Sequence, residues 1–209
     1  MFVQQMQVGQ MAVFAYLVGD SITGDALVID PADNVHDLLA LAANHGLQIN
    51  YIVNTHGHVD HIGGNADMKR LTGAKIIVHE ADAVMLTSTP QAMLRMFGAK
   101  QSPPPDVLVQ DGQIISVGNV ELKVIHTPGH SPGGICLYTP GYVFTGDTLF
   151  VEAVGRTDLP GGSWQTLYNA IQSRLFTLPD ETRVMPGHNY GRTPTSTIGH
   201  EKKYNPSIR

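Results

Sequence analysis

The sequence predicts an α/β sandwich in which helices cover one sheet and a second sheet follows. Short apolar runs and amphipathic helices alternate through residues 1–80 in the order β, β, α, β, α, β. From Val107 onward, short β-favouring runs are separated by glycine turns, which indicates a second sheet. The chain has 209 residues, of which 42% are hydrophobic and 15% are charged, and this suits a single domain over residues 1–209.

The elements of the first sheet are expected within the first 80 residues. The apolar runs Met11–Val18 and Ala26–Ile29 are separated by a polar turn, so they predict a hairpin. Val35–His45 carries apolar residues at helical spacing and is followed by Gly46, a common residue after a helix end. Two further strands and one helix are expected at Tyr51–Asn54, Lys75–Val78 and residues 65–71.

Residues 82–105 are rich in methionine and end in three consecutive prolines, Pro103–Pro105. One interpretation is a helix or two packed on the sheet, followed by a stiff connector. The alternative is a lid or apolar wall near a functional site. The sequence leaves both interpretations open.

The second half of the chain is predicted to form short strands and one long helix. Strands are expected at Val107–Val109, Ile114–Val117, Glu121–Ile125, Gly134–Tyr138, Tyr142–Thr145 and Arg183–Met185. Ser163 is expected to cap a helix that closes before Pro179. The apolar face of this helix carries Trp164, Leu167, Tyr168, Ile171 and Leu175.

The densest group of ionisable side chains is the stretch His56–His61, which follows a predicted strand. It holds three imidazoles and a carboxylate within six residues. Clustered imidazoles repel one another once protonated, and a buried unpaired carboxylate is costly. A divalent metal removes both problems, because neutral imidazole and ionised carboxylate are its ligands. The alternative is a histidine-rich surface loop.

Further candidate ligands each follow a predicted strand and lie beside a glycine. These are His130, Asp147 and His188. The full candidate set is His56, His58, Asp60, His61, His130, Asp147 and His188. His56, His58 and His130 are assigned to one ion. Asp60, His61 and His188 are assigned to a second ion, with Asp147 between the two.

Two other residues near these ligands have open roles. Asp30 ends a predicted strand and is either a turn residue or a carboxylate that orients a metal-bound histidine. His126 is interpreted as structural or as a support for a ligand.

The ligand set, His-x-His-x-Asp-His followed by His130, Asp147 and His188, resembles that of the metallo-β-lactamase superfamily. The resemblance covers nearly the whole chain. It implies an αββα sandwich, an α/β fold of four layers, with a metal site at the edge between the two sheets. It also implies two divalent metal ions, with zinc preferred and iron or a mixed iron and zinc pair as alternatives.

Residues 146–150, 155–162 and 194–206 are similar to the glyoxalase II-like branch, in its short single-domain form. That resemblance implies a metal-dependent hydrolase acting on thioesters of the hydroxyacylglutathione type, such as S-lactoylglutathione, through a metal-bound hydroxide. Asp60 would orient the attacking water as the catalytic residue. Arg156 and Tyr190 are candidates for substrate binding. The alternative for Arg156 is an ion pair with Asp158.

The chain departs from the glyoxalase II-like pattern in two places, and both put glutathione in question as the thiol carrier. Only 21 residues follow His188, too few for the helical domain that helps to hold glutathione in longer relatives. Ala153–Arg156 stands where the family has Gly-Cys-Gly-Arg.

Iron-dependent persulfide dioxygenase has the same fold and keeps all seven ligands, and it binds one iron through the equivalents of His56, His130 and Asp147. The hydrolase is the preferred interpretation.

The composition narrows the range of partners and the expected location. The net charge is −5 and no basic run stands out, so nucleic acid is not expected as a partner. Cys136 is the single cysteine, which excludes an intramolecular disulfide. The first residues lack a signal-peptide pattern, and no apolar run approaches membrane-spanning length. A cytoplasmic monomer or homodimer acting on a small-molecule thioester, without a membrane partner, is therefore expected.

Overall fold

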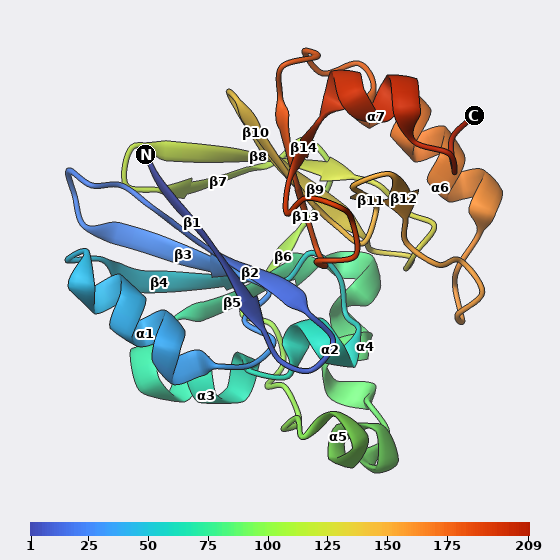
Figure 1. The fold of residues 1–209 in the computed structure, drawn as a ribbon. Coiled ribbons are helices and arrows are strands. Elements are labelled where there is room, and N and C mark those ends of the chain that lie inside the picture. The colour runs from blue at the N-terminus through green and yellow to red at the C-terminus, as the bar shows by residue number, and fades with distance from the viewer.

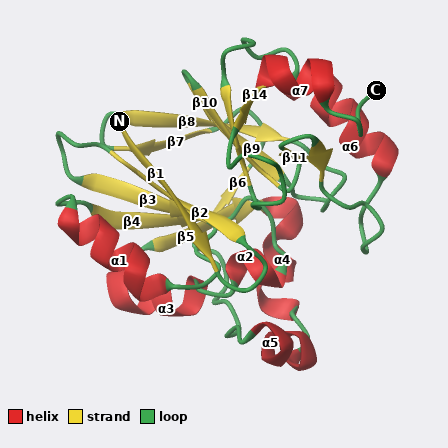
Figure 2. Cartoon of the chain, in the orientation of Figure 1, coloured by secondary structure: helices red, strands yellow, loops and turns green.

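Two six-stranded sheets lie face to face in the computed structural model, which describes residues 1–209. Helices cover the outer face of each sheet, so that the layers follow the order α, β, β, α (Figures 1 and 2). This confirms the fold class expected from the sequence. No helix is both long and apolar enough to span a bilayer.

The first sheet has the strand order β1-β2-β3-β4-β5-β6. Its strands are β1 (Phe2–Val8), β2 (Val13–Gly19), β3 (Asp25–Ile29), β4 (Gln48–Val53), β5 (Lys75–His79) and β6 (Val107–Val109). The strands from β1 to β3 pair antiparallel, which confirms the predicted hairpin, and those from β3 to β6 pair in parallel. Its outer face is covered by α1 (Val35–Asn44) and α3 (Asn65–Thr72) (Figure 1).

The second sheet has the strand order β14-β13-β10-β9-β8-β7. Its strands are β7 (Ile114–Val117), β8 (Val120–His126), β9 (Ile135–Thr139), β10 (Tyr142–Gly146), β13 (Arg183–Pro186) and β14 (Ser196–Thr197). On its outer face lie α6 (Trp164–Ala170), a π-helical turn (Ile171–Leu175) and α7 (Ile198–Tyr204). A short pair, β11 (Leu149–Phe150) and β12 (Ala153–Val154), stands beside it.

The remaining short helices lie near one end of the sandwich. They are α2 (Val59–Ile62), a 3-10 turn (Glu80–Asp82), α4 (Ala83–Ser88) and α5 (Gln91–Phe97). Asp60 and His61 lie on the helical turn α2. One predicted feature differs here, because α5 projects below the sheet beside α2 instead of packing on the sheet (Figure 1).

The apolar side chains form three clusters, one between each pair of neighbouring layers. Strand β2 contributes side chains to two of these clusters. Val13, Ala15 and Leu17 belong to the cluster under α1 and α3, whereas Phe14 and Tyr16 belong to the cluster between the sheets. Because both faces of the strand are buried, its sequence is continuously apolar and does not alternate with polar residues.

The prediction that Val107–Val109 belongs to the second sheet was wrong. This strand, β6, pairs in parallel with β5 and ends the first sheet. Asp106 makes the junction, because its backbone N–H donates to the Ile76 carbonyl and its carboxylate accepts from the Ile76 N–H at 2.7 Å. The proline connector thus returns the chain to the edge of β5 before it crosses to the second sheet.

Ser163 caps α6 as predicted, since its hydroxyl accepts a hydrogen bond from the Thr166 backbone N–H. We expect Ser163→Ala to lower the free energy of unfolding by about 1 kcal/mol, because a donor of the first turn loses its partner. Ser163→Asp should keep most of that stability. Chemical denaturation measures both, with the exposed Ser173→Ala as the control. Equal stability of Ser163→Ala and the parent chain would exclude the capping role.

Candidate metal centre

The predicted ligands come from four loops that meet where the two sheets share an edge. His56 to His61 follow β4 in the first sheet, whereas His130, Asp147 and His188 follow β8, β10 and β13 in the second. Strands β10 and β13 are parallel, so Asp147 and His188 leave the sheet at the same end. The sheets are joined here by backbone hydrogen bonds, from Ile135 N–H to the Thr55 carbonyl and from Phe14 N–H to the Gly187 carbonyl.

Six of the seven predicted ligands form two groups. The ligand atoms of His56, His58 and His130 lie within 4.8 Å of one another, and so do those of Asp60, His61 and His188. Within the first group, His58 Nδ1 lies 2.9 Å from His130 Nε2. Within the second group, His61 Nε2 lies 3.0 Å from His188 Nε2. These are the same two groups that the sequence analysis assigned to two ions.

Asp147 lies between the two groups. Its Oδ2 atom is 3.5 Å from His130 Nε2 in the first group and 3.4 Å from His188 Nε2 in the second. His61 Nε2 is 3.3 Å from Asp147 Oδ1. A carboxylate in this position contacts histidines of both groups, which is the arrangement that a bridging ligand needs.

Two buried polar atoms at this point have no hydrogen-bond partner. They are His56 Nε2 and Asp147 Oδ1. Buried polar atoms in folded proteins nearly always have a partner, and these two belong to residue types that bind divalent cations. The chemistry of the donor set therefore fits a metal, with nitrogen donors from both groups and carboxylate oxygens from Asp60 and Asp147.

The electrostatics favour the ligand form of these side chains. Burial lowers the pKa of His56 well below its ordinary value and that of His58 to about 4, so both imidazoles are neutral at pH 7. Burial opposes ionisation of Asp147, but the charge of His61 and the proximity of His188 hold the Asp147 pKa well below its usual range. The ionised carboxylate and the neutral rings are the forms that bind metal.

His61 differs from the other histidines. Burial lowers its pKa, but the charges of Asp147 and Asp60 outweigh burial and raise the pKa well above the ordinary value. Two carboxylates therefore stabilise positive charge at this ring. A divalent cation among the same carboxylates would be stabilised for the same reason.

Asp30 lies against the second group. Its carboxylate accepts hydrogen bonds from the Thr55 N–H at 2.8 Å and the Thr55 hydroxyl at 2.6 Å, and it lies 3.0 Å from His61 Nδ1. A proton on Nδ1 leaves His61 Nε2 free to bind a metal. Asp30 also has a positive φ of 47°, so a strained turn and an orienting carboxylate occur in the same residue.

Backbone carbonyls orient two more histidines. His130 Nδ1 donates to the Arg156 carbonyl at 2.7 Å, and His188 Nδ1 donates to the Met11 carbonyl at 2.8 Å. Each bond turns the Nε2 atom toward the other ligands. His126 stacks on His79 with 4.1 Å between ring centroids and bonds the Pro132 carbonyl, which supports the loop that carries His130.

The two candidate substrate residues lie in different environments. The Arg156 guanidinium makes two 2.7 Å bonds to Asp158, and both side chains are exposed, so the ion pair named as its alternative is present. Tyr190 stacks on His188 with 4.5 Å between ring centroids and an interplanar angle of 10°. Burial and the charges of Asp147 and Asp60 raise the Tyr190 pKa, so its hydroxyl stays protonated beside the site.

Asp82 is a buried residue of the site that the sequence analysis missed. Its Oδ2 accepts from the Gly57 N–H at 2.9 Å and the Ser131 hydroxyl at 2.7 Å, and its Oδ1 accepts from the Gly133 N–H at 2.6 Å. One carboxylate therefore fastens the loop of His56 and His58 to the loop of His130. No local sequence pattern marks it, because its partners lie 25 to 51 positions away.

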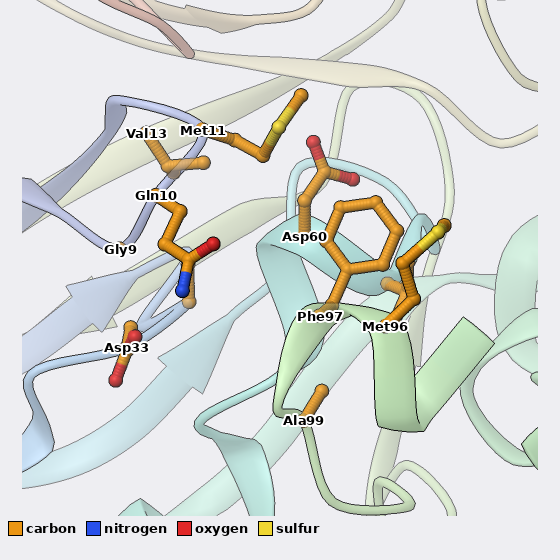
Figure 3. A pocket seen from close by; sticks show the side chains of 11 residues that line it. Gly9, Gln10, Met11, Val13, Asp33, Asp60, Met96, Phe97 and Ala99 are labelled. Atoms are coloured by element: carbon orange, nitrogen blue, oxygen red, sulfur yellow. The ribbon is translucent and has the colours of Figure 1, made fainter. Parts of the chain in front are cut away.

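A cavity of about 280 Å³ opens beside Asp60, whose side chain lies at its edge (Figure 3). Met96 and Phe97 at the end of α5 form one wall. The second interpretation of residues 82–105, an apolar wall near the site, therefore agrees with the observed position of α5. Met96 is 70% exposed, so it does not serve as ordinary core packing.

Comparison with known proteins agrees with this geometry. The model of the metallo-beta-lactamase superfamily matches residues 8–188. Mitochondrial persulfide dioxygenase ETHE1 of Mus musculus is 31% identical over 98% of this chain and 75% of that protein. Among solved structures, the BLEG-1 B3 metallo-beta-lactamase superposes with a TM-score of 0.89 at 29% identity, over 99% of both chains. TTHA1623, solved in a di-iron-bound form, gives 0.86 at 35% identity, over 98% of this chain and 99% of that chain.

The family match spans most of the chain, and the four-layer fold and the clustered histidines and aspartates agree with it. The chain belongs to the metallo-β-lactamase superfamily, whose members are metal-dependent enzymes.

Proposed function

We propose that this protein hydrolyses small thioesters at a centre of two divalent metal ions, with zinc as the expected metal. Water adds to the acyl carbon, the carbon–sulfur bond breaks, and a carboxylic acid and a thiol are released. The observation that carries the proposal is the presence of two complete ligand groups with Asp147 between them. Two metals held about one carboxylate are typical of hydrolytic centres.

When bound, the two cations would supply a water activated near neutral pH and would polarise the acyl carbonyl. The side chains of the protein orient the ligands and accept the proton of the attacking water. Asp60 is half-buried at the edge of the cavity, with Oδ2 3.5 Å from His188 Nε2, and it accepts the proton of the attacking water at that oxygen. Asp30 keeps His61 in the tautomer that binds through Nε2.

The proposed reaction uses no protein nucleophile. Cys136 is fully buried, and burial raises its pKa to about 11, so a reactive thiolate does not form at pH 7. The thiolate of the substrate is a much weaker base than an alkoxide and departs without an acid that protonates it. Tyr190, beside His188, is in a position to donate a hydrogen bond to a substrate oxygen.

A second candidate is iron-dependent persulfide oxidation. The relative named persulfide dioxygenase favours it. The di-iron-bound form of TTHA1623 supports iron as the metal, but not a single iron. It would use a single iron held by His56, His130 and Asp147. The ligand set does not separate the two activities, because the dioxygenase keeps all seven ligands. The hydrolase remains the first choice because residues 146–150, 155–162 and 194–206 resemble the glyoxalase II-like branch.

Thioester cleavage can be measured directly through the released thiol. We expect turnover of S-lactoylglutathione or of simple N-acetylcysteamine thioesters, with one acid formed per thiol. Chelation should abolish turnover, and added zinc should restore it, because the water depends on the metal. Absence of turnover with every thioester in the zinc-loaded protein would overturn the proposal.

A further inference from the structure

The cavity beside Asp60 is built from parts of the chain that lie far apart in sequence. The turn between β1 and β2 contributes Met11, and the end of α5 contributes Met96 and Phe97 (Figure 3). Helix α2 contributes Val59. Helices α2 and α5 pack against each other, so the walls are held together. The cavity is thus a defined space next to the candidate metal centre.

The walls are apolar and carry no positive charge. Seven of the eleven lining residues are hydrophobic, and the two charged ones, Asp33 and Asp60, are both acidic. A carboxylate ligand such as the glutathione moiety would meet repulsion here and no arginine or lysine partner. A neutral hydrocarbon chain would be desolvated against Met11, Val59 and Phe97 without such a cost.

The cavity also has a fixed relation to the reacting groups. Met11 forms a wall and accepts the hydrogen bond of His188 through its carbonyl, while Asp60 belongs to both the cavity and the second ligand group. A chain seated in the cavity therefore begins beside Asp60. Its volume, about 280 Å³, equals the space of roughly nine water molecules in the liquid.

We propose that this cavity holds the acyl chain of the substrate, and that the substrates are thioesters of neutral, apolar acyl groups of about four to eight carbons. The inference rests on the proposed thioester hydrolysis and names its substrate class. It makes Phe97, Met96 and Ala99 specificity-determining residues. The first two lie at the end of α5, and Ala99 lies just after it. This position also accounts for the exposed methionine on a helix that does not pack on a sheet.

The test compares N-acetylcysteamine thioesters with acetyl, butanoyl, hexanoyl and octanoyl groups. We expect kcat/KM to rise about three- to fourfold per methylene until the cavity is filled. Ala99→Phe, which fills the cavity, should flatten the rise, and Phe97→Ala should lower the gain per methylene. Met93→Ala is the matched control on α5, because Met93 does not line the cavity, and its chain-length profile should equal that of the parent chain.

A flat profile in the parent chain, or the parent profile in both Ala99→Phe and Phe97→Ala, would overturn the inference while leaving thioester hydrolysis in place. Binding to the metal-free protein gives a readout that is independent of activity. Calorimetry should show hexanamide binding at least tenfold tighter than acetamide, and Ala99→Phe should abolish the difference. If no thioester is cleaved, the proposed function fails, and this binding result alone decides whether the cavity holds an apolar chain.

Discussion

Asp147→Asn is expected to lower thioester turnover by at least about 10³-fold, which corresponds to roughly 4 kcal/mol of transition-state stabilisation. Asp147 approaches the Nε2 atoms of histidines in both ligand groups, His130 in the first and His61 and His188 in the second. The amide keeps the shape of the side chain but removes the charge that would hold two cations together. Steady-state rates of thiol release, with metal content measured on the same samples, check the result.

The control for Asp147→Asn is Asp180→Asn, which removes a surface carboxylate paired with Lys202. That variant should keep the activity of the parent chain. Cooperative thermal unfolding of Asp147→Asn would show that the loss arises at the site and not from misfolding. Activity within a few-fold of the parent chain would rule out Asp147 as a shared ligand.

Asp82→Asn is expected to lower the free energy of unfolding by about 2–4 kcal/mol, because three donors face its carboxylate and an amide places an N–H against at least one of them. The same change should weaken metal binding by about 10- to 100-fold, since Asp82 fixes the two loops that carry His56, His58 and His130 without binding metal itself. Chemical denaturation and zinc titration with a competing chelator measure the two effects.

Ser131→Ala separates the contributions to this network, because it removes a single donor to Asp82. It should cost less stability than Asp82→Asn and should leave the Gly57 and Gly133 bonds intact. If Asp82→Asn binds zinc as tightly as the parent chain, the carboxylate serves the fold alone and does not position the ligands.

The ligand groups could be predicted from the sequence because each loop that carries ligands follows a strand and contains a glycine. In the structure, strands β10 and β13 pair in parallel and leave the sheet at one end, which brings Asp147 and His188 together. The apolar runs in β2 and β3 are continuous because both faces of these strands are covered. The unbroken apolar runs are visible in the sequence and predict these two strands.

Other features depend on contacts between distant segments. The assignment of β6 to the first sheet is made by Asp106 at the edge of β5, and a three-residue apolar run carries no information about its partner. Asp82 resembles any acidic residue at the start of a helix, and its role exists only because the loops of Gly57 and Gly133 lie beside it. The cavity likewise needs Met11 and Phe97 to meet across α2.

Metal content is the measurement that tests the two-metal account most directly. The protein is purified without added metal, its metals are quantified per chain by mass spectrometry, and thioester hydrolysis and persulfide-dependent oxygen uptake are assayed side by side. The account predicts two zinc ions per chain together with thioester turnover. One iron per chain with oxygen uptake and no thioester turnover would contradict it.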